Sequence, residues 1–351
     1  MRRYNINFIC NRFINIIQLK CKIKTAGYGK GMVIYMKQKL KHFVILSGLT
    51  TIVIHIINRV YYSLYTAKNS LRYPKNNYYE WRFGKIRYTK KGTGSPILLI
   101  HDLRVGSSVY EFSKISDLLS KNHEVYSIDL LGYGLSDKPN ITYTNYLYVQ
   151  LIIDFIKNII GKKTDIIATG DSSPITIMAC HNDPEVINKM IYINPQNLYE
   201  SNQIPSKQTK LLKLLLDIPV IGTFIYNLLT DKSSIERNFK EEYFYNVLNI
   251  EEKDISAYLE AAHLPDHTSK YSFSSYIGKY INTNFIHALK EINHSIYLIG
   301  GDGKENIHTT LENYIYYNNA IESVYIPYTK HLPHLEAPEK TIKYINIFLD
   351  S

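Results

Sequence analysis

Cysteine is scarce in this sequence. The 351 residues contain three, Cys10, Cys21 and Cys180, and their spacing fits neither a zinc ligand set nor a disulfide framework. This excludes a cysteine-based zinc site and a disulfide-stapled fold, and we expect neither a metal nor another cofactor. With 45% apolar residues the chain can build a large core, so an intrinsically disordered protein is excluded as well.

Acidic residues are almost missing from the first 80 positions. Glu80 is the single one there, against fourteen Lys and Arg, whereas the rest of the chain holds 27 basic and 30 acidic residues. The formal charge of +10 therefore comes from the N-terminal arm, and the remainder is close to neutral. No zinc-finger, RNA-recognition or helix-turn-helix spacing accompanies the basic residues, so we expect no nucleic-acid partner.

Charged residues are missing altogether between Lys41 and Arg59. The apolar segment 42–58 is, at about 1.5 Å per residue, just long enough to cross a hydrocarbon core as a helix. We expect a single transmembrane anchor there, preceded by a basic arm (1–41) and followed by a linker (59–78). Ten Lys and Arg precede the segment and four follow it closely, which favours a cytoplasmic N-terminus and a body outside. A cleaved signal peptide and a buried soluble helix are the alternatives.

From position 79 onward, apolar strand patterns alternate with helical ones. The expected strands are a hairpin over 80–89 and single strands over 96–102, 124–129, 164–169, 190–195, 295–301 and 323–327, with helices at 110–119, 147–160 and at the C-terminus. Strands that alternate with helices predict an α/β fold with a mostly parallel, doubly wound sheet. Ligands of such sheets bind at the carboxyl ends of the strands.

The stretch 164–180 has the sharpest local signal. Its β-branched run stops at Gly170, polar residues follow up to Ser173, and the next apolar residues have helical spacing. The pattern predicts a strand, a tight turn and a helix. Such a turn lifts one side chain above the edge of the sheet.

Four motifs, in this order along the chain, resemble those of the α/β-hydrolase family. They are His101-Asp102 after an apolar strand, the Asp-x-x-Gly-x-Gly-x-Ser loop that begins at Asp129, the turn at Gly170, and the stretch 331–339, which is similar to the family's Gly-His-x-Pro-x-x-Glu-x-Pro. The resemblance extends over about residues 79–350. It implies an α/β-hydrolase fold that acts on a small-molecule substrate.

The resemblance also divides the body of the chain. It implies a hydrolase core over 79–195 and 295–351, with the insertion 196–294 as a helical cap above the active site. The segment 211–229 of this cap is conspicuously apolar. Either these side chains pack the cap onto the core, or they form a greasy tunnel or a membrane-facing lid.

A catalytic triad and an oxyanion hole are implied by the same resemblance. The base would be His331, which follows an expected strand, although Lys330 stands where the family has glycine. The acid that orients this histidine would be Asp302, directly after the strand 295–301, with Glu305 as the alternative.

The nucleophile depends on the register in which the turn is interpreted. If 170–174 matches the family's Gly-x-Ser-x-Gly, Ser172 is the nucleophile and Pro174 replaces the second glycine. Counting back along the following helix places Gly170, which has no side chain, at the nucleophile position instead. A third register offers Asp171, as in relatives that resemble haloalkane dehalogenases or epoxide hydrolases. Without any nucleophile, Ser172 and Ser173 would simply cap the helix.

The oxyanion hole would consist of the backbone amides of Leu103 and Ser173. Asp102 replaces the family glycine beside this hole, so a negative charge stands where one should be stabilised.

Two functions follow from these observations. The first is a membrane-anchored serine hydrolase that cleaves an uncharged, lipophilic ester through a covalent acyl-enzyme. The second is a catalytically inactive relative that binds a ligand or partner at the membrane. The order of the four motifs and the apolar cap support the first, which we prefer, and the irregular turn, Asp102 and Lys330 motivate the second.

Overall fold

The computed structural model describes residues 30–71, 76–265 and 267–350. The described residues form an eight-stranded sheet with the strand order β1-β2-β4-β3-β5-β6-β7-β8. The pairs β1–β2 and β2–β4 are antiparallel, and all the others are parallel. This confirms the mostly parallel sheet predicted from the sequence. The strands are β1 (Asn77–Trp81), β2 (Gly84–Lys91), β3 (Ser95–Ile100), β4 (His123–Ile128), β5 (Thr164–Thr169), β6 (Ile187–Ile193), β7 (Ile296–Gly301) and β8 (Glu322–Ile326).

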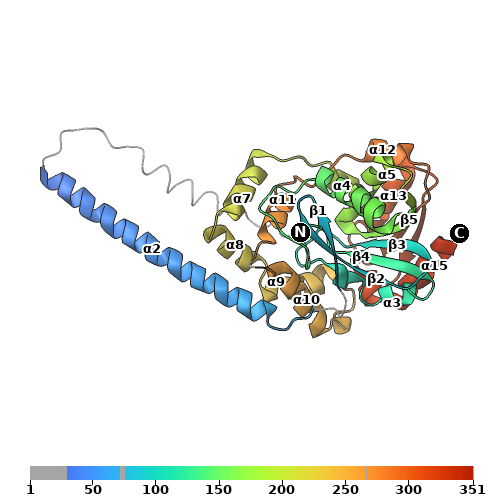
Figure 1. Cartoon of the computed structure of the whole chain (residues 1–351), viewed down its shortest axis with the longest axis horizontal. Helices are drawn as coiled ribbons and strands as arrows, with labels where there is room; N and C mark the ends of the chain where they lie inside the picture. The colour runs from blue at the N-terminus through green and yellow to red at the C-terminus, as the bar shows by residue number, and fades with distance from the viewer. Residues whose placement is uncertain (1–29, 72–75, 266, 351) are drawn as a thin grey trace. The chain divides into compact units, whose positions relative to one another are not determined.

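Helices cover both faces of the sheet (Figure 1). Leu98 and Ile100 of β3 belong to the cluster that includes α4 and α5, whereas Ile97 and Leu99 belong to the cluster that includes α3 and α15. This alternation follows from the two-residue period of a strand. The core helices are α3 (Ser116–Leu119), α4 (Asn145–Phe155), α5 (Ser173–Asn182), α13 (Ile307–Tyr317), α14 (Pro333–Glu336) and α15 (Pro338–Asp350).

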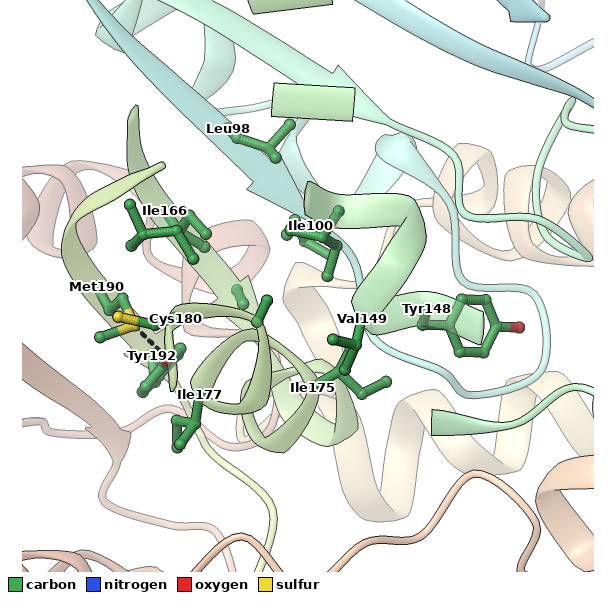
Figure 2. Packing of buried hydrophobic residues seen from close by; sticks show 14 of the residues in the cluster. Leu98, Ile100, Tyr148, Val149, Ile166, Ile175, Ile177, Cys180, Met190 and Tyr192 are labelled. Atoms are coloured by element: carbon green, nitrogen blue, oxygen red, sulfur yellow. Dashed lines mark hydrogen bonds between the residues drawn. The ribbon is translucent and has the colours of Figure 1, made fainter. Parts of the chain in front are cut away.

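The largest cluster fixes α5 against the middle of the sheet. Figure 2 shows Leu98, Ile100 and Ile166 of β3 and β5 together with Ile175 and Ile177 of α5, which belong to the same cluster. All five side chains are buried. Because α5 begins directly after β5, this packing holds the turn between them at the carboxyl edge of the sheet.

Two predicted helices differ from the structure. The helix expected over 110–119 is a 3₁₀ turn, Val109–Phe112, followed by the short α3. The helix expected from 147 begins at Asn145, because the Thr144 hydroxyl accepts a hydrogen bond from the amide of Leu147 at 3.3 Å and caps it.

Between β6 and β7 the described chain is mostly helical. Its helices are α6 (Leu198–Ser201), α7 (Lys207–Asp217), α8 (Ile221–Leu229), α9 (Lys232–Asn238), α10 (Glu252–His263), α11 (Lys270–Ile277) and α12 (Ile286–Glu291). The last of them packs with the sheet, since Phe285, Ala288 and Leu289 are part of the largest cluster.

Helix α2 (Lys30–Thr66) contains the predicted anchor and continues through the first part of the predicted linker. Its portion Gln38–Thr66 is long and apolar enough, by length and composition, to cross a membrane, with a mean hydropathy of 1.8. The chain divides into two units between Val53 and Ile54, so the last turns of α2 belong to the same unit as the sheet and the helices between β6 and β7.

Candidate functional site

Gly170 stands at the apex of the turn between β5 and α5. It follows the last residue of β5 and adopts a φ of +52°, a backbone conformation that side-chain-bearing residues rarely adopt. A Cβ built on Gly170 would overlap the carboxylate of Asp102. The tight turn predicted from the sequence is present, but the position that points above the sheet edge has no side chain.

The Asp102 carboxylate occupies the space beside Gly170. Its Oδ1 accepts hydrogen bonds from the backbone amides of Leu103 and Asp171, both at 2.7 Å. Its Oδ2 accepts a hydrogen bond of 2.7 Å from Nε2 of His331 and lies 3.4 Å from Nε of Arg104. Asp102 is 1% exposed, so three hydrogen-bond donors and the nearby guanidinium of Arg104 replace the water that a buried carboxylate needs.

The two amides that bind Asp102 form the cradle expected for an oxyanion. One of them, Leu103, was predicted from the sequence, but the second is the amide of Asp171 rather than that of Ser173. The Ser173 amide instead donates to the carbonyl of Gly170 within the turn. The second amide lies two residues earlier than predicted because Gly170, and not Ser172, comes directly after the strand. For the same reason, the apex of the turn has no side chain.

The hydroxyls of Ser172 and Ser173 donate hydrogen bonds to backbone carbonyls around the turn and make none to His331. The Ser172 hydroxyl is fully buried and donates to the carbonyl of His101 at 2.5 Å, and that of Ser173 donates to the carbonyl of Gly170 at 2.8 Å. Neither side chain makes the helix cap that the sequence offered as an alternative, since the first residue before α5 has no side-chain cap bond. The structure therefore does not bring Ser172 and His331 together.

His331 lies where the sequence placed the base, after β8 and before α14. Its ring is buried, packs 5.5 Å from the ring of Tyr243, and uses Nε2 for Asp102. Nδ1 is buried without a hydrogen-bond partner among the described residues. Burial lowers the pKa of His331 well below its ordinary value, and the charges of Arg104 and Lys304 lower it further.

Neither predicted acid contacts this ring. The side chain of Asp302 is 47% exposed and accepts a hydrogen bond of 2.9 Å from His308, and Glu305 is exposed at the surface. In a Ser-His-Asp triad, a carboxylate at Nδ1 holds the imidazole in the tautomer that accepts the proton of the serine. The triad Ser172–His331–Asp302 predicted from the sequence is not assembled in this structure.

Asp171, the alternative nucleophile, lies one residue beyond the apex of the turn. Its carboxylate accepts a hydrogen bond of 2.7 Å from the hydroxyl of Tyr276, which the cap helix α11 contributes. Burial raises the pKa of Asp171, and the neighbouring Asp102 raises it further. The side chain thus ties the turn to the cap instead of pointing at His331.

A third carboxyl group, that of Glu111, accepts a hydrogen bond from the backbone next to Asp102. It accepts hydrogen bonds from the amide of Asp102 at 3.1 Å, from Thr169 at 2.9 Å and from the hydroxyl of Tyr258 at 3.2 Å. Burial, with the nearby charge of Asp102, raises the pKa of Glu111 to about 7. This network fixes the backbone that carries Asp102.

Asn194 was missed by sequence reasoning, although it positions the histidine loop. Its Nδ2 donates to the carbonyls of Lys330 and His331 at 2.8 and 2.9 Å, and its Oδ1 accepts from the amide of Gly301 at 2.9 Å. The residue has a φ of +50° at the end of β6. A polar residue directly after an apolar strand, as in Ile193-Asn194, is the sequence signal that could have found it.

The Asp129 loop has a structural role. The Asp129 carboxylate accepts hydrogen bonds from the amides of Val109 and Leu135 at 2.8 and 2.9 Å, and Ser136 donates to its carbonyl at 2.6 Å. Gly134 is required because a Cβ there would overlap that carboxylate. The motif holds the loop beside β3 and takes no part in the contacts of His331.

The helical segment between β6 and β7 and the loop after β3 line a small cavity at this edge of the sheet. A cavity of about 10 Å³ lies beside the oxyanion loop, with room for about one water molecule. Its lining comes from the core residues Leu103, Val105, Gly106, Gly132 and Tyr133 and from the cap residues Tyr226, Ala261, Ser269, Ser272 and Phe273.

Comparison with known proteins identifies the family. A family model described as the alpha/beta hydrolase family matches residues 97–343, which is more than half of the chain. The chain belongs to this family. The four alpha/beta hydrolase motifs that the sequence suggested, His101-Asp102, the Asp129 loop, the turn at Gly170 and the stretch 331–339, all lie within the matched range.

One curated relative is a 2-hydroxy-6-oxo-6-(2'-aminophenyl)hexa-2,4-dienoic acid hydrolase of Metapseudomonas resinovorans. It is 28% identical over 118 residues, or 32% of this chain and 40% of the relative. The alpha/beta hydrolase chain described here thus matches about two fifths of the length of its curated relatives.

Solved structures share the fold over longer stretches. A serine hydrolase involved in carbazole degradation has a TM-score of 0.63 at 17% identity and covers 79% of this chain and 98% of its own. A bacterial membrane phospholipase A, described as a virulence factor, has a TM-score of 0.63 at 18% identity and covers 90% of this chain and 98% of its own. At these identities the likeness establishes the alpha/beta hydrolase fold.

Proposed function

We propose that this chain is a membrane-anchored alpha/beta hydrolase relative that does not hydrolyse esters through a serine and instead binds a ligand or partner at the membrane. The observation that carries the proposal is the pairing of Gly170 with Asp102. The first lacks the nucleophile, and the second fills its place with a carboxylate that is already bonded to His331.

The electrostatics of the site support the absence of ester turnover. The amides of Leu103 and Asp171 would have to stabilise the negative oxygen of a tetrahedral intermediate, yet they bind a carboxylate oxygen of the protein itself. A second negative charge beside Asp102 is unfavourable in so dry a site. His331 also lacks a carboxylate at Nδ1 to orient it as a base.

Anchoring by α2 is supported by the length and composition of Gln38–Thr66. The exposed apolar side chains Phe43, Leu46, Leu49 and Ile52 in this portion suit contact with lipid better than with water. The excess of basic residues before the span favours a cytoplasmic N-terminus with the hydrolase domain on the other side. Retention of the full chain in membranes after an alkaline wash tests the anchoring.

The catalytic part of the proposal is tested by ester turnover. The full chain is reconstituted in vesicles and offered p-nitrophenyl esters with short and long acyl chains, beside the variants Ser172→Ala and His331→Ala. We expect the wild type to release no more nitrophenol than the two variants. Turnover that both variants abolish would re-establish the serine hydrolase predicted from the sequence.

A second candidate function is hydrolysis in which Asp102 is the nucleophile. It is favoured by the orientation of the carboxylate, with Oδ1 on the two amides and Oδ2 toward His331. Oδ2 would attack an electrophilic carbon, whose leaving group departs with the bonding electron pair. Once Oδ2 is esterified, the imidazole proton would have to move from Nε2 to Nδ1, so that Nε2 can take a proton from water. The resulting hydroxide would attack the carboxyl carbon, and the proton on Nε2 would pass to the departing alkoxide, which releases the alcohol and restores the carboxylate.

This candidate makes a separate prediction. A single turnover in H₂¹⁸O would leave one heavy oxygen on the peptide that contains Asp102, and Asp102→Asn would abolish it. Incubation with alkyl halides and epoxides without any gain of mass on that peptide would leave binding as the function.

A further inference from the structure

We propose that the hairpin of α7 and α8 inserts its apolar side chains into the bilayer next to the point where α2 leaves it, so that the cap itself rests in the membrane. The proposal rests on the anchoring by α2 proposed above. It concerns a surface of the cap that is separate from the site of Asp102 and His331.

The hairpin exposes an unusual amount of apolar surface. α7 and α8 lie at one edge of the body, with α11 beside α7 (Figure 1). Their large aliphatic side chains that face away from the protein are between 36% and 63% exposed: Leu211, Leu214, Leu215, Ile218, Ile221, Leu228 and Leu229. Clustering of this kind marks a contact surface, whereas single exposed leucines do not.

The few charged residues of the hairpin are either neutralised or placed where they can reach lipid headgroups. The only acid of α7, Asp217, is neutralised by Lys213 at 2.6 Å, and this lysine is 8% exposed. No charged residue occurs from 218 to 230. Lys207 and Lys210 are exposed in the first turn of α7, where they can reach anionic headgroups while the leucines enter the acyl region.

The composition of the hairpin is that of a bent, membrane-inserted segment. Taken together, Lys207–Asp217 and Ile221–Leu229 are as apolar as a membrane span, with a bend of 107° between them. A bend of this size prevents a straight crossing. It suits a segment that lies in one leaflet, where the helices satisfy their own backbone hydrogen bonds.

Contacts with α2 place the hairpin at the membrane. Nδ2 of Asn58 donates to the carbonyl of Val220 at 3.0 Å, and Nδ2 of Asn227 donates to Oδ1 of Asn58 at 3.0 Å. The Asn58 carbonyl is 2.8 Å from Nε2 of His267, so the end of the uncharged segment 42–58 is fixed to the cap from two sides. If 42–58 spans the bilayer, Asn58 lies at its surface, and the bend of the hairpin at Val220 lies there too.

Tryptophan substitutions in the full chain test the proposal, because the sequence has a single tryptophan, Trp81, which is buried in the core. The variants Leu214→Trp and Leu228→Trp report on the hairpin, and Ile52→Trp reports on the anchor. Tyr316→Trp, at an 81% exposed position of α13, is the matched control. Each protein is reconstituted in vesicles of anionic and zwitterionic lipids whose acyl chains carry bromine, which quenches tryptophan on contact.

We expect the added emission of the Leu214→Trp, Leu228→Trp and Ile52→Trp variants to be mostly lost in brominated lipid, and that of Tyr316→Trp to be unchanged. Quenching at position 52 without quenching at 214 and 228 would overturn the proposal while leaving the anchor in place. Absence of quenching at all three positions would remove the anchor as well. Hairpin emission that resists both bromine and aqueous acrylamide would assign the surface to a protein partner, such as a second copy of this chain, and would also overturn the proposal.

Discussion

The carboxyl ends of β5 and β3 have exchanged roles in this protein. β5 keeps the tight turn and its positive φ at Gly170 but presents no side chain, whereas the turn after β3 presents a carboxylate in that space. The backbone of a nucleophile turn is therefore not enough to identify an enzyme of this family. What decides the chemistry is which strand end supplies the side chain beside His331.

The largest effect is expected from reversing this exchange. Asp102→Gly combined with Gly170→Ser would free the amides of Leu103 and Asp171 and place a hydroxyl beside Nε2 of His331. A fluorophosphonate probe should then label position 170, by about 10²-fold or more over wild type, because an oxyanion donor and a nucleophile are gained together. Mass spectrometry of the labelled peptide checks the site. Asp102→Gly alone should stay unlabelled. Labelling of the wild type to the same extent as the double variant would contradict the claim that the ends of β3 and β5 have exchanged roles.

The single substitution Gly170→Ser should be the most destabilising change at the turn. Its Cβ would overlap Asp102, and its φ of +52° is unfavourable for serine, so the carboxylate must leave its amides. We expect a loss of about 2–4 kcal/mol in the free energy of unfolding, measured by urea denaturation. The double variant with Asp102→Gly should recover part of this loss. Equal losses in both would mean that the two strand ends are independent.

Burial lowers the pKa of two imidazoles, those of His331 and His334, but only the first has a hydrogen-bond partner in the described part of the chain. His331 has Asp102 as a partner, whereas both ring nitrogens of His334 lack one among the described residues, and burial lowers the pKa of His334 to about 3. Because the unfolded chain takes up this proton near pH 6.5 and the folded chain does not, stability falls as the pH drops from about 6.5 toward 3.

Replacing this second imidazole should remove that share of the acid sensitivity. In His334→Phe, whose ring can stack on Phe112 as the imidazole does, the loss of stability between pH 7 and pH 4.5 should be smaller by about 2–3 kcal/mol. Urea titrations at both pH values measure the difference. An unchanged loss would show that His334 is protonated in the folded protein.

The smallest effect is expected at Ser172. Its hydroxyl donates to the carbonyl of His101, so Ser172→Ala leaves a buried carbonyl without this donor and should cost about 1 kcal/mol of stability. Probe labelling of the exchanged variant should be unaffected by Ser172→Ala. A loss of that labelling would show that Ser172 takes part in the reaction with the probe and would contradict the proposed register of the turn.

The sequence predicted the fold well because its signals are local. Short apolar strands, the turn at Gly170 and the position of His331 after a strand are all visible within a few residues, and the structure places them as expected. The sheet order adds little new information once the strands are known, because parallel strands joined by helices have few arrangements.

The site itself was predicted only in part, because its contacts join distant residues. Asp102 and His331 are 229 positions apart, and nothing near either of them signals the bond. The departure from the family glycine at 102 was visible, but its consequence depended on whether Gly170 or Ser172 follows the strand, a difference of two residues. Asp302 was misleading for a similar reason, since a carboxylate after β7 can face either the histidine or the solvent.

The tautomer of His331 tests the central claim most directly. An imidazole that donates from Nε2 to Asp102 must hold its proton there and leave Nδ1 bare, whereas the base of a serine triad holds its proton on Nδ1. Nitrogen-15 NMR of histidine-labelled protein, with His331→Gln to assign the signal, distinguishes the two. We predict a protonated Nε2 at neutral pH. A protonated Nδ1 with a bare Nε2 would contradict the placement of Asp102 in the site.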